Sequence, residues 1–309
     1  MDESHKIIFV VGPTASGKSA WTLDQVQKFG GSIVNADSIQ FYSDLKIGSA
    51  APTEAEMQLV PHYLYGYVNP PSEMTAGDFV RDFYQLIKNK NDLKWPVYLV
   101  GGTGFYVQAL EKGMYDLPPA DPTLQKQLEE ELAENGSLIL HKELLCADPE
   151  SKIHVNDHFR LVRALEIWRK FKIPPSQFKE KTQNKNPLHL PFIKIGFQQA
   201  KDESIKRITK RTKQMLQLGL IQETDFFLQQ GFENWAPMSS VGYFQTMEYL
   251  KGKQKNILKL EQDINTATWQ LVKKQKTWFK RDTSILWSDG CEKMNLSAQS
   301  KLDQFLNRN

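Results

Sequence analysis

The chain has 309 residues, of which 40% are hydrophobic and 24% are charged, and its formal net charge at pH 7 is +3. A chain of this length and composition can bury a sizeable core in one large or two smaller domains. The weak positive charge permits a nucleic-acid partner without requiring one. No apolar run approaches the roughly 20 residues of a membrane span, and the first apolar stretch is too short for a signal peptide. The two cysteines, Cys146 and Cys291, form no metal-ligand spacing and indicate reduced thiols in a cytoplasmic protein.

The first predicted strand, residues 7–11, leads directly into a phosphate-binding sequence. Residues 12–19 read Gly-Pro-Thr-Ala-Ser-Gly-Lys-Ser and match G-x-x-x-x-G-K-[ST] at every fixed position. In this pattern backbone N–H groups line a concavity, and the start of the following helix adds its positive dipole end. The lysine reaches phosphate oxygens, and the last hydroxyl can ligate a Mg²⁺ that the phosphates also bind. We therefore expect a diphosphate site formed by Gly12, Pro13, Thr14, Ala15, Ser16, Gly17, Lys18 and Ser19, with Mg²⁺ on Ser19.

Two further buried strands end at polar residues. Residues 32–35 lead to Asp37, and residues 97–100 are closed by a Gly-Gly-Thr-Gly turn that contains Thr103. Strands separated by helices predict a parallel sheet flanked by helices, an α/β fold like that of P-loop NTPases. Since ligands bind at the carboxyl ends of such strands, the phosphate loop, Asp37 and Thr103 are expected along one edge. An Asp there can hold Mg²⁺ through water or accept a proton from a nucleophile, whereas a turn or helix-cap role is the plainer alternative.

The character of the sequence changes at about residue 117. A proline-rich break at 117–122 precedes amphipathic helical sequence that continues to about residue 171, and a polar stretch follows at 179–189. Strand-like sequence resumes at 192–197, followed by a long helix at 202–218, and a last strand is expected at 284–287. We therefore predict a core domain of residues 1–116 and 191–309 that is interrupted by a mostly helical domain of residues 117–190.

Several basic residues have two possible interpretations. Arg207 and Arg211 share one face of the long helix, and Arg160 and Arg163 lie in the helical insertion. A further basic set at 273–281 is interleaved with Trp269, Trp278 and Phe279. Such sets suit a nucleic-acid surface, but solvated faces of amphipathic helices explain them equally well. From these residues alone the chain is a phosphate-binding α/β enzyme, for which a kinase is the default interpretation.

The ordered series of motifs is more specific than any single motif. After the phosphate loop come Asn35-Ala-Asp-Ser-Ile-Gln40, Ile47-Gly-Ser-Ala-Ala-Pro52, Pro61-His62, Leu99-Val-Gly-Gly-Thr-Gly-Phe-Tyr106, residues 157–166 with Arg163-Ala-Leu-Glu166, Met215-Leu-Gln-Leu-Gly-Leu220, Ser240-Val-Gly-Tyr243 and Lys274-Gln-Lys-Thr-Trp-Phe279. Over residues 6–282 this series resembles the bacterial tRNA dimethylallyltransferases, the IPP transferase family, which prenylate an adenosine beside the anticodon.

The resemblance implies a reaction and a set of site residues. The phosphate loop would hold the diphosphate of dimethylallyl diphosphate, which leaves as N6 of the adenosine at tRNA position 37 attacks C1. Asp37 would be the general base, Thr103 would orient a substrate, and Arg211 would stabilise the diphosphate. The tRNA anticodon stem-loop would be clasped by the insertion. The implied tRNA contacts are Asp37, Ser38, Ile39, Gln40, Thr103, Phe159, Arg160, Leu161, Val162 and Arg163. Nothing requires more than a monomer or involves a membrane.

Three segments depart from the family pattern. The usual Pro-His-His-Leu-Ile-Asp is Pro61-His-Tyr-Leu-Tyr-Gly66, Tyr-Arg-Gly-Met is Tyr42-Ser-Asp-Leu45, and Arg-Gln-Leu-Thr-Trp-Phe-Arg is Lys274-Gln-Lys-Thr-Trp-Phe-Lys280. Lysine cannot reproduce the bidentate contacts of arginine. The departures concern tRNA contacts and turnover and leave the diphosphate site whole.

Three other functions share parts of this pattern. One is prenyl transfer to a free adenine nucleotide, as in the cytokinin-forming isopentenyltransferases, although the long insertion favours a macromolecular acceptor. A second is a P-loop kinase for a nucleoside or small molecule, which leaves the rest of the motif series unexplained. A third is a nucleic-acid-binding ATPase, which would hydrolyse ATP when RNA is present.

Overall fold

The computed structural model describes residues 5–89, 93–114, 120–177, 188–253, 256–290 and 294–307. The chain divides into two compact units, one of residues 1–109 together with 189–309 and one of residues 110–188. Three features discussed from the sequence lie outside the described residues: residues 117–119 of the predicted break at 117–122, most of the polar stretch 179–189, and Cys291.

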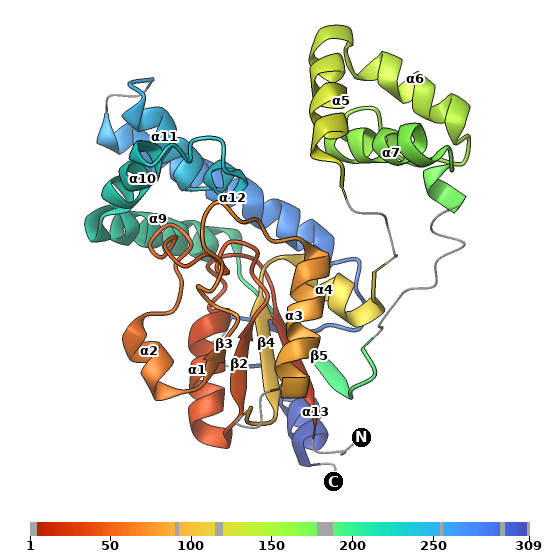
Figure 1. Cartoon of the computed structure of the whole chain (residues 1–309). Helices are drawn as coiled ribbons and strands as arrows, with labels where there is room; N and C mark the ends of the chain where they lie inside the picture. Colours follow the sequence, from red (N-terminus) through yellow and green to blue (C-terminus); the bar gives the residue numbers. More distant parts are fainter. Residues whose placement is uncertain are drawn as a thin grey trace. The chain divides into compact units, whose positions relative to one another are not determined.

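The first unit is built on a six-stranded parallel sheet (Figure 1), as the alternation of strands and helices predicts. Its strands, in the spatial order β3-β2-β4-β1-β5-β6, are β1 (Ile7–Val11), β2 (Ser32–Asn35), β3 (His62–Tyr63), β4 (Val97–Gly101), β5 (Phe192–Gln198) and β6 (Leu286–Asp289). β1 is central, and Ile7 lies opposite Val97 on one side and Phe192 on the other. β6 begins two residues later than the sequence suggests, and the two-residue β3 has no run of apolar residues that would predict it.

Helices flank this sheet. In the first unit they are α1 (Lys18–Phe29), α2 (Glu54–Leu59), α3 (Ala76–Asn89), α4 (Gly104–Lys112), α9 (Lys201–Leu218), α10 (Leu220–Gln229), the 3₁₀ turn η1 (Ala236–Ser239), α11 (Tyr243–Leu250), α12 (Ile257–Phe279) and α13 (Leu296–Asn307). Trp21 of α1 and Leu302 of α13 belong to one buried cluster with Ile8 and Tyr98 of the sheet. The apolar stripes of these two helices therefore cover the same face of the sheet.

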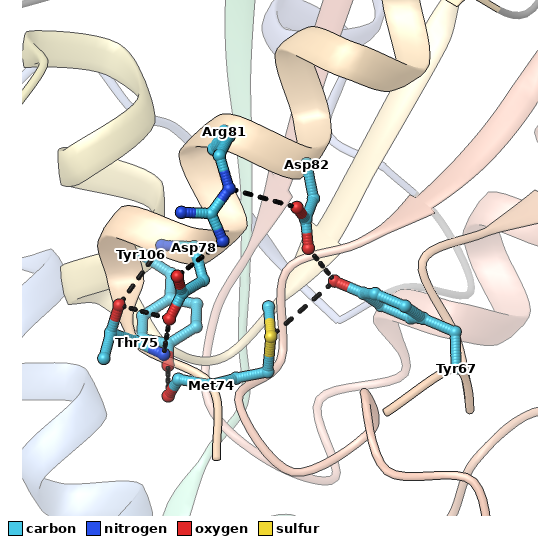
Figure 2. Close-up of polar contacts among 7 residues, drawn as sticks. All are labelled: Tyr67, Met74, Thr75, Asp78, Arg81, Asp82 and Tyr106. Carbon is cyan, nitrogen blue, oxygen red and sulfur yellow. Dashed lines mark hydrogen bonds and ion pairs between the residues drawn. The ribbon is translucent and has the colours of Figure 1, made fainter. Parts of the chain in front are cut away.

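A polar network fixes the start of α3 (Figure 2). Thr75 and Asp78 form a capping box, since the Asp78 N–H donates to Thr75 Oγ1 and the Thr75 N–H donates to Asp78 Oδ2. The Tyr106 hydroxyl of α4 donates to the Met74 carbonyl at 2.9 Å, and Tyr67 donates to Asp82 at 2.6 Å. This network joins α3 and α4 to the segment that follows β3.

α9 and α12 pack together above the end of the sheet that carries the phosphate loop (Figure 1). α9 ends where Gly219 adopts a left-handed conformation, with φ of 105°, and its N–H closes the last turn onto Leu216. No helix in the described part of the chain has the length and apolar character that crossing a membrane requires.

The second unit contains α5 (Pro122–Asn135), α6 (Ser137–Ala147) and α7 (His158–Phe171). Their apolar faces meet in one cluster that includes Leu128, Leu144 and Leu165. Asp157 caps α7 by accepting from the Arg160 N–H. The predicted helical sequence is therefore helical in α5, α6 and α7, and residues 148–157 between α6 and α7 are not helical.

Candidate active site

The phosphate loop, residues 12–19, turns sharply between β1 and α1. Gly12 has a φ of 137°, and a Cβ there would lie 2.3 Å from the Phe197 carbonyl oxygen, so that only glycine fits. Gly17 and Ala15 also have positive φ, at 91° and 62°. This conformation curls the loop around the start of α1, where unpaired helix N–H groups favour an anion.

Lys18 lies folded across this loop. Its Nζ donates to the carbonyls of Gly12 at 2.9 Å and Pro13 at 2.8 Å. Burial lowers the pKa of Lys18 from 10.5 to about 8, although the negative charge of Asp37 opposes the shift, and Arg211 lowers it further. The hydroxyl of Ser16 is buried and has no hydrogen-bond partner within the described structure. A buried hydroxyl of this kind fits an anion in the loop.

Asp37 and Thr103 meet where β2 and β4 end. The Asp37 N–H donates to Asn35 Oδ1 at 2.8 Å, which fixes the turn. Thr103 Oγ1 accepts from the Ser38 N–H at 3.0 Å and donates to Ser38 Oγ at 3.2 Å. The Thr103 hydroxyl therefore joins the two turns, although they are far apart in sequence.

Arg211 reaches the same site from α9. Its Nη2 donates to the Ser49 carbonyl at 3.4 Å, at the outer limit for a hydrogen bond. Burial lowers the pKa of Arg211, and the charge of Asp37 opposes that shift. Lys18, Asp37 and Arg211 thus influence one another electrostatically, with two cations facing one carboxylate.

One cavity of about 280 Å³ joins Asp37, Thr103 and Arg211 to Thr14 of the phosphate loop. Its polar wall includes Thr14, Asp37, Thr103 and Arg211. Its apolar wall comes mainly from α9 and α12, and its residues are Ile39, Ile208, Met215, Val241, Ile264 and Leu271. The cavity is therefore charged at one side and apolar at another, which suits a ligand with an anionic head and a hydrocarbon group.

Two other predicted site residues line a separate space. Ser19 and Gln40 border a smaller cavity of about 70 Å³ together with Glu56, His62 and Tyr65. The Gln40 side chain also donates to the carbonyls of Ser49 and Ala50 at 3.0 and 2.9 Å. Burial lowers the pKa of His62 and raises that of Tyr65.

The residues predicted at 159–163 lie in the second unit and differ in exposure. Phe159 is 82% exposed, and the exposed Arg160 forms an ion pair with Asp157. Leu161 and Val162 are buried in the apolar cluster of that unit, so their side chains do not reach its surface. Arg163 donates to the buried carboxylate of Glu166, and this interaction gives the arginine a structural role.

The family model for IPP transferase matches residues 40–282, and the model for isopentenyl transferase matches residues 5–70. The chain belongs to the IPP transferase family. The resemblance inferred from the motif series is therefore confirmed.

Relatives in this family match the chain over nearly its whole length. A tRNA dimethylallyltransferase of Bdellovibrio bacteriovorus is 48% identical over 294 residues, covering 92% of this chain and 93% of that protein. One of Synechocystis is 36% identical and covers 96% of this chain and 95% of that protein. The crystal structure of the tRNA isopentenylpyrophosphate transferase of Bacillus halodurans aligns with a TM-score of 0.68 at 26% identity, covering 98% and 97% of the two chains.

The structure adds polar residues that the sequence did not single out for the site. Gln275 of α12 lines the large cavity, accepts from the Thr14 N–H at 2.8 Å and donates to the Gly102 carbonyl at 3.1 Å. Its place inside the Lys-Gln-Lys-Thr-Trp-Phe motif is a signal that could have identified it. Glu223 and Tyr243 contact the loop after Asp37. Tyr243 ends the Ser240-Val-Gly-Tyr243 motif, which is a signal of the same kind. Glu223 belongs to no motif, and no pattern in one sequence points to it.

Proposed function

We propose that this protein transfers the dimethylallyl group of dimethylallyl diphosphate to N6 of the adenosine at position 37 of tRNA, next to the anticodon, and releases diphosphate. The nitrogen forms a bond to C1, the C1–O bond breaks with its electron pair leaving on diphosphate, and the N6 proton goes to a base. The observation that carries the proposal is the convergence of Asp37, Thr103, Arg211 and the phosphate-loop residue Thr14 on one cavity in a member of the IPP transferase family.

The phosphate loop would hold the leaving diphosphate. Its N–H groups, the Ser16 hydroxyl, Lys18 and Arg211 offer donors and positive charge where negative charge grows as the C1–O bond breaks. Lys18 now donates to carbonyls of its own loop, so diphosphate would offer it stronger acceptors.

Mg²⁺ would bind at Ser19, the last residue of the phosphate loop, which borders the smaller cavity. Among the described residues no group of three or more His, Cys, Asp or Glu side chains could hold a metal ion. The Ser19 hydroxyl, the oxygens of the diphosphate and water would be its ligands, which is a usual set for this ion. When bound, it would neutralise charge on the departing diphosphate.

Asp37 would act as the base and Thr103 as an orienting group. Asp37 borders the cavity beside Thr103, and its backbone is held by Asn35. The apolar wall of α9 and α12 would hold the five-carbon group and keep water from its reactive carbon. The adenine would have to leave its stack to enter this cavity.

The second unit would bind the anticodon stem-loop. Phe159 offers an exposed aromatic face for a base, and Arg160 beside it offers a charge for phosphate. We assign the prenyl diphosphate site to the first unit and tRNA binding mainly to the second. One chain supplies every residue of this scheme, so a monomer suffices.

The test is incubation with dimethylallyl diphosphate, Mg²⁺ and unmodified tRNA, followed by mass spectrometry of the digested RNA. We expect isopentenyladenosine at position 37 and no prenylated product from AMP or ATP. Product on the free nucleotide would instead indicate a nucleotide prenyltransferase. Loss of a phosphoryl group from ATP without prenyl transfer would indicate a kinase or an ATPase.

Two variants test the role of the second unit. Phe159→Ala and Arg160→Glu should raise the KM for tRNA while leaving binding of dimethylallyl diphosphate unchanged. Arg163→Glu is a poor probe because it would place a carboxylate against the buried Glu166. Unchanged tRNA kinetics in both variants would contradict tRNA binding by this surface.

A further inference from the structure

The loop of residues 45–50, between β2 and α2, is held by a carboxylate from another part of the chain. Glu223 of α10 accepts from three consecutive backbone N–H groups, those of Lys46, Ile47 and Gly48, at distances between 2.8 and 3.1 Å. Three successive N–H groups aimed at one point form an anion site, and here the anion is part of the protein.

Tyr243 of α11 completes this arrangement. Its hydroxyl donates to Glu223 Oε1 and accepts from the Gly48 N–H at 3.1 Å. The ring is fully buried, and a Cβ on Gly48 would lie 2.5 Å from it. Burial, with the adjacent Glu223 charge, raises the pKa of Tyr243, so the phenol keeps the proton that it donates.

The loop in turn contacts the active site. Gly48 and Ser49 border the large cavity, and the Ser49 carbonyl accepts from Arg211 Nη2. The same carbonyl accepts from the Gln40 side chain. This carbonyl therefore links the loop to the Arg211 guanidinium and contributes to where that group lies.

We propose that Glu223 and Tyr243 are positioning residues for prenyl transfer, which act by fixing the loop 45–50 and through it the guanidinium of Arg211. This inference rests on the proposed function, because it assigns Arg211 to the departing diphosphate. Neither residue touches the reacting atoms; their effect passes through hydrogen bonds to the backbone of the loop.

The physical reason lies in how charge develops during the reaction. Negative charge on the diphosphate is greatest as the C1–O bond breaks, so a displaced Arg211 costs more in the transition state than in the donor complex. Released diphosphate carries that charge fully and resembles the leaving group more than the donor does. A loosened loop should therefore affect kcat and diphosphate affinity more than the KM for the donor.

The test is a double-mutant cycle of Glu223→Gln with Arg211→Ala. A carboxamide offers one acceptor oxygen in place of two, so the three N–H groups of the loop cannot all be satisfied. In the wild-type protein Glu223→Gln should lower kcat about tenfold and weaken binding of inorganic diphosphate about tenfold. These losses are smaller than those expected when a donor such as the Arg211 guanidinium is removed outright. In the Arg211→Ala background Glu223→Gln should change neither quantity, since no guanidinium remains to be positioned.

Two further variants complete the design. Tyr243→Phe removes only the hydroxyl and keeps the ring against Gly48, so it can replace Glu223→Gln in the cycle if that variant does not fold. Its effects on kcat and diphosphate affinity should be smaller, and they should also vanish in the Arg211→Ala background. Asp225→Asn, on the same helix, makes the same charge change away from the loop and should leave both quantities unaltered.

The results separate this inference from the proposed function. Equal losses in both backgrounds, or losses that only follow the amount of folded protein, would overturn the positioning role. Calorimetry with inorganic diphosphate measures the coupling between Glu223 and Arg211 even if no tRNA is prenylated. Failure of the transfer assay would therefore count against the proposed function alone. No effect of Glu223→Gln or Tyr243→Phe on diphosphate binding would refute the inference directly.

Discussion

Gln275→Glu is expected to separate two loops of the active site that the glutamine side chain now joins. The amide of Gln275 accepts from the phosphate loop at Thr14 and donates to the glycine-rich turn at Gly102. Glutamate has the same shape but, when ionised, no donor. The Gly102 carbonyl would then face a carboxylate oxygen instead of an N–H.

The structure gives two magnitudes for this change. A part-buried carbonyl left without its donor costs about 1–3 kcal/mol of folding free energy. The new charge lies 2.8 Å from the Thr14 nitrogen, so a phosphate oxygen bound to the same nitrogen would be within about 6 Å of it. At an effective dielectric constant of about 20, with some screening by salt, the repulsion is about 2 kcal/mol. That corresponds to about thirtyfold weaker diphosphate binding.

Two assays measure these effects separately. Urea unfolding reports the folding free energy, and calorimetry with inorganic diphosphate reports the affinity. Gln275→Leu, which removes both hydrogen bonds without adding charge, should lower stability similarly but weaken diphosphate binding much less. Gln262→Glu, on an exposed position of the same helix, is the matched control for charge. If Gln275→Glu binds diphosphate as well as Gln262→Glu does, Gln275 does not border the diphosphate site.

Other variants test the remaining assignments. Asp37→Asn should reduce turnover by about 10²–10⁴-fold, the usual contribution of a general base, with diphosphate affinity measured by calorimetry nearly unchanged; near-normal turnover would exclude that role. Lys18→Ala should weaken diphosphate binding itself, and an unaltered affinity would contradict the use of the loop. Asp282→Asn removes the carboxylate that pairs at 2.6 Å with the buried Lys194. Because breaking a buried pair costs about 3–5 kcal/mol and Asp282 is 34% exposed, we expect a loss of about 2 kcal/mol in urea unfolding. The pKa of Asp282 is held below its usual value by Lys194 and Ser284, despite partial burial, which opposes the shift. This stabilisation should be present at neutral pH and be lost as the pH falls through the lowered pKa of Asp282. If acid lowers the free energy of unfolding of the wild-type protein no more than that of the variant, this explanation is refuted.

The architecture of the first unit was largely predictable because its signals are local. An apolar strand followed by a glycine-rich turn and a helix identifies β1, the phosphate loop and α1, and the same pattern recurs at β4 and α4. The rule that parallel strands present their carboxyl ends at one edge placed Asp37 and Thr103 together, and their turns do meet at Ser38. β3 was not predicted, because a strand of two residues is too short to show an alternating apolar pattern.

Exposure at residues 159–163 illustrates a limit of motif reasoning. The family resemblance implies that all five of these consecutive residues contact tRNA. A helix, however, turns about 100° per residue, so their side chains point to different sides. Phe159 and Arg160 face solvent, whereas Leu161 and Val162 enter the core. Which residues of a motif contact a partner is therefore decided by packing.

The sequence by itself determined the phosphate loop, the strands other than β3 and the family. These rest on short-range patterns of backbone conformation and hydrophobicity. Only the tertiary structure decided that Gln275 joins two loops and that Glu223 fills an anion site made by residues 46–48. Such contacts join residues 173 to 261 positions apart. A hydrogen bond between a side chain and a distant backbone group leaves no periodic trace in either segment, because it depends on where the fold brings the two together.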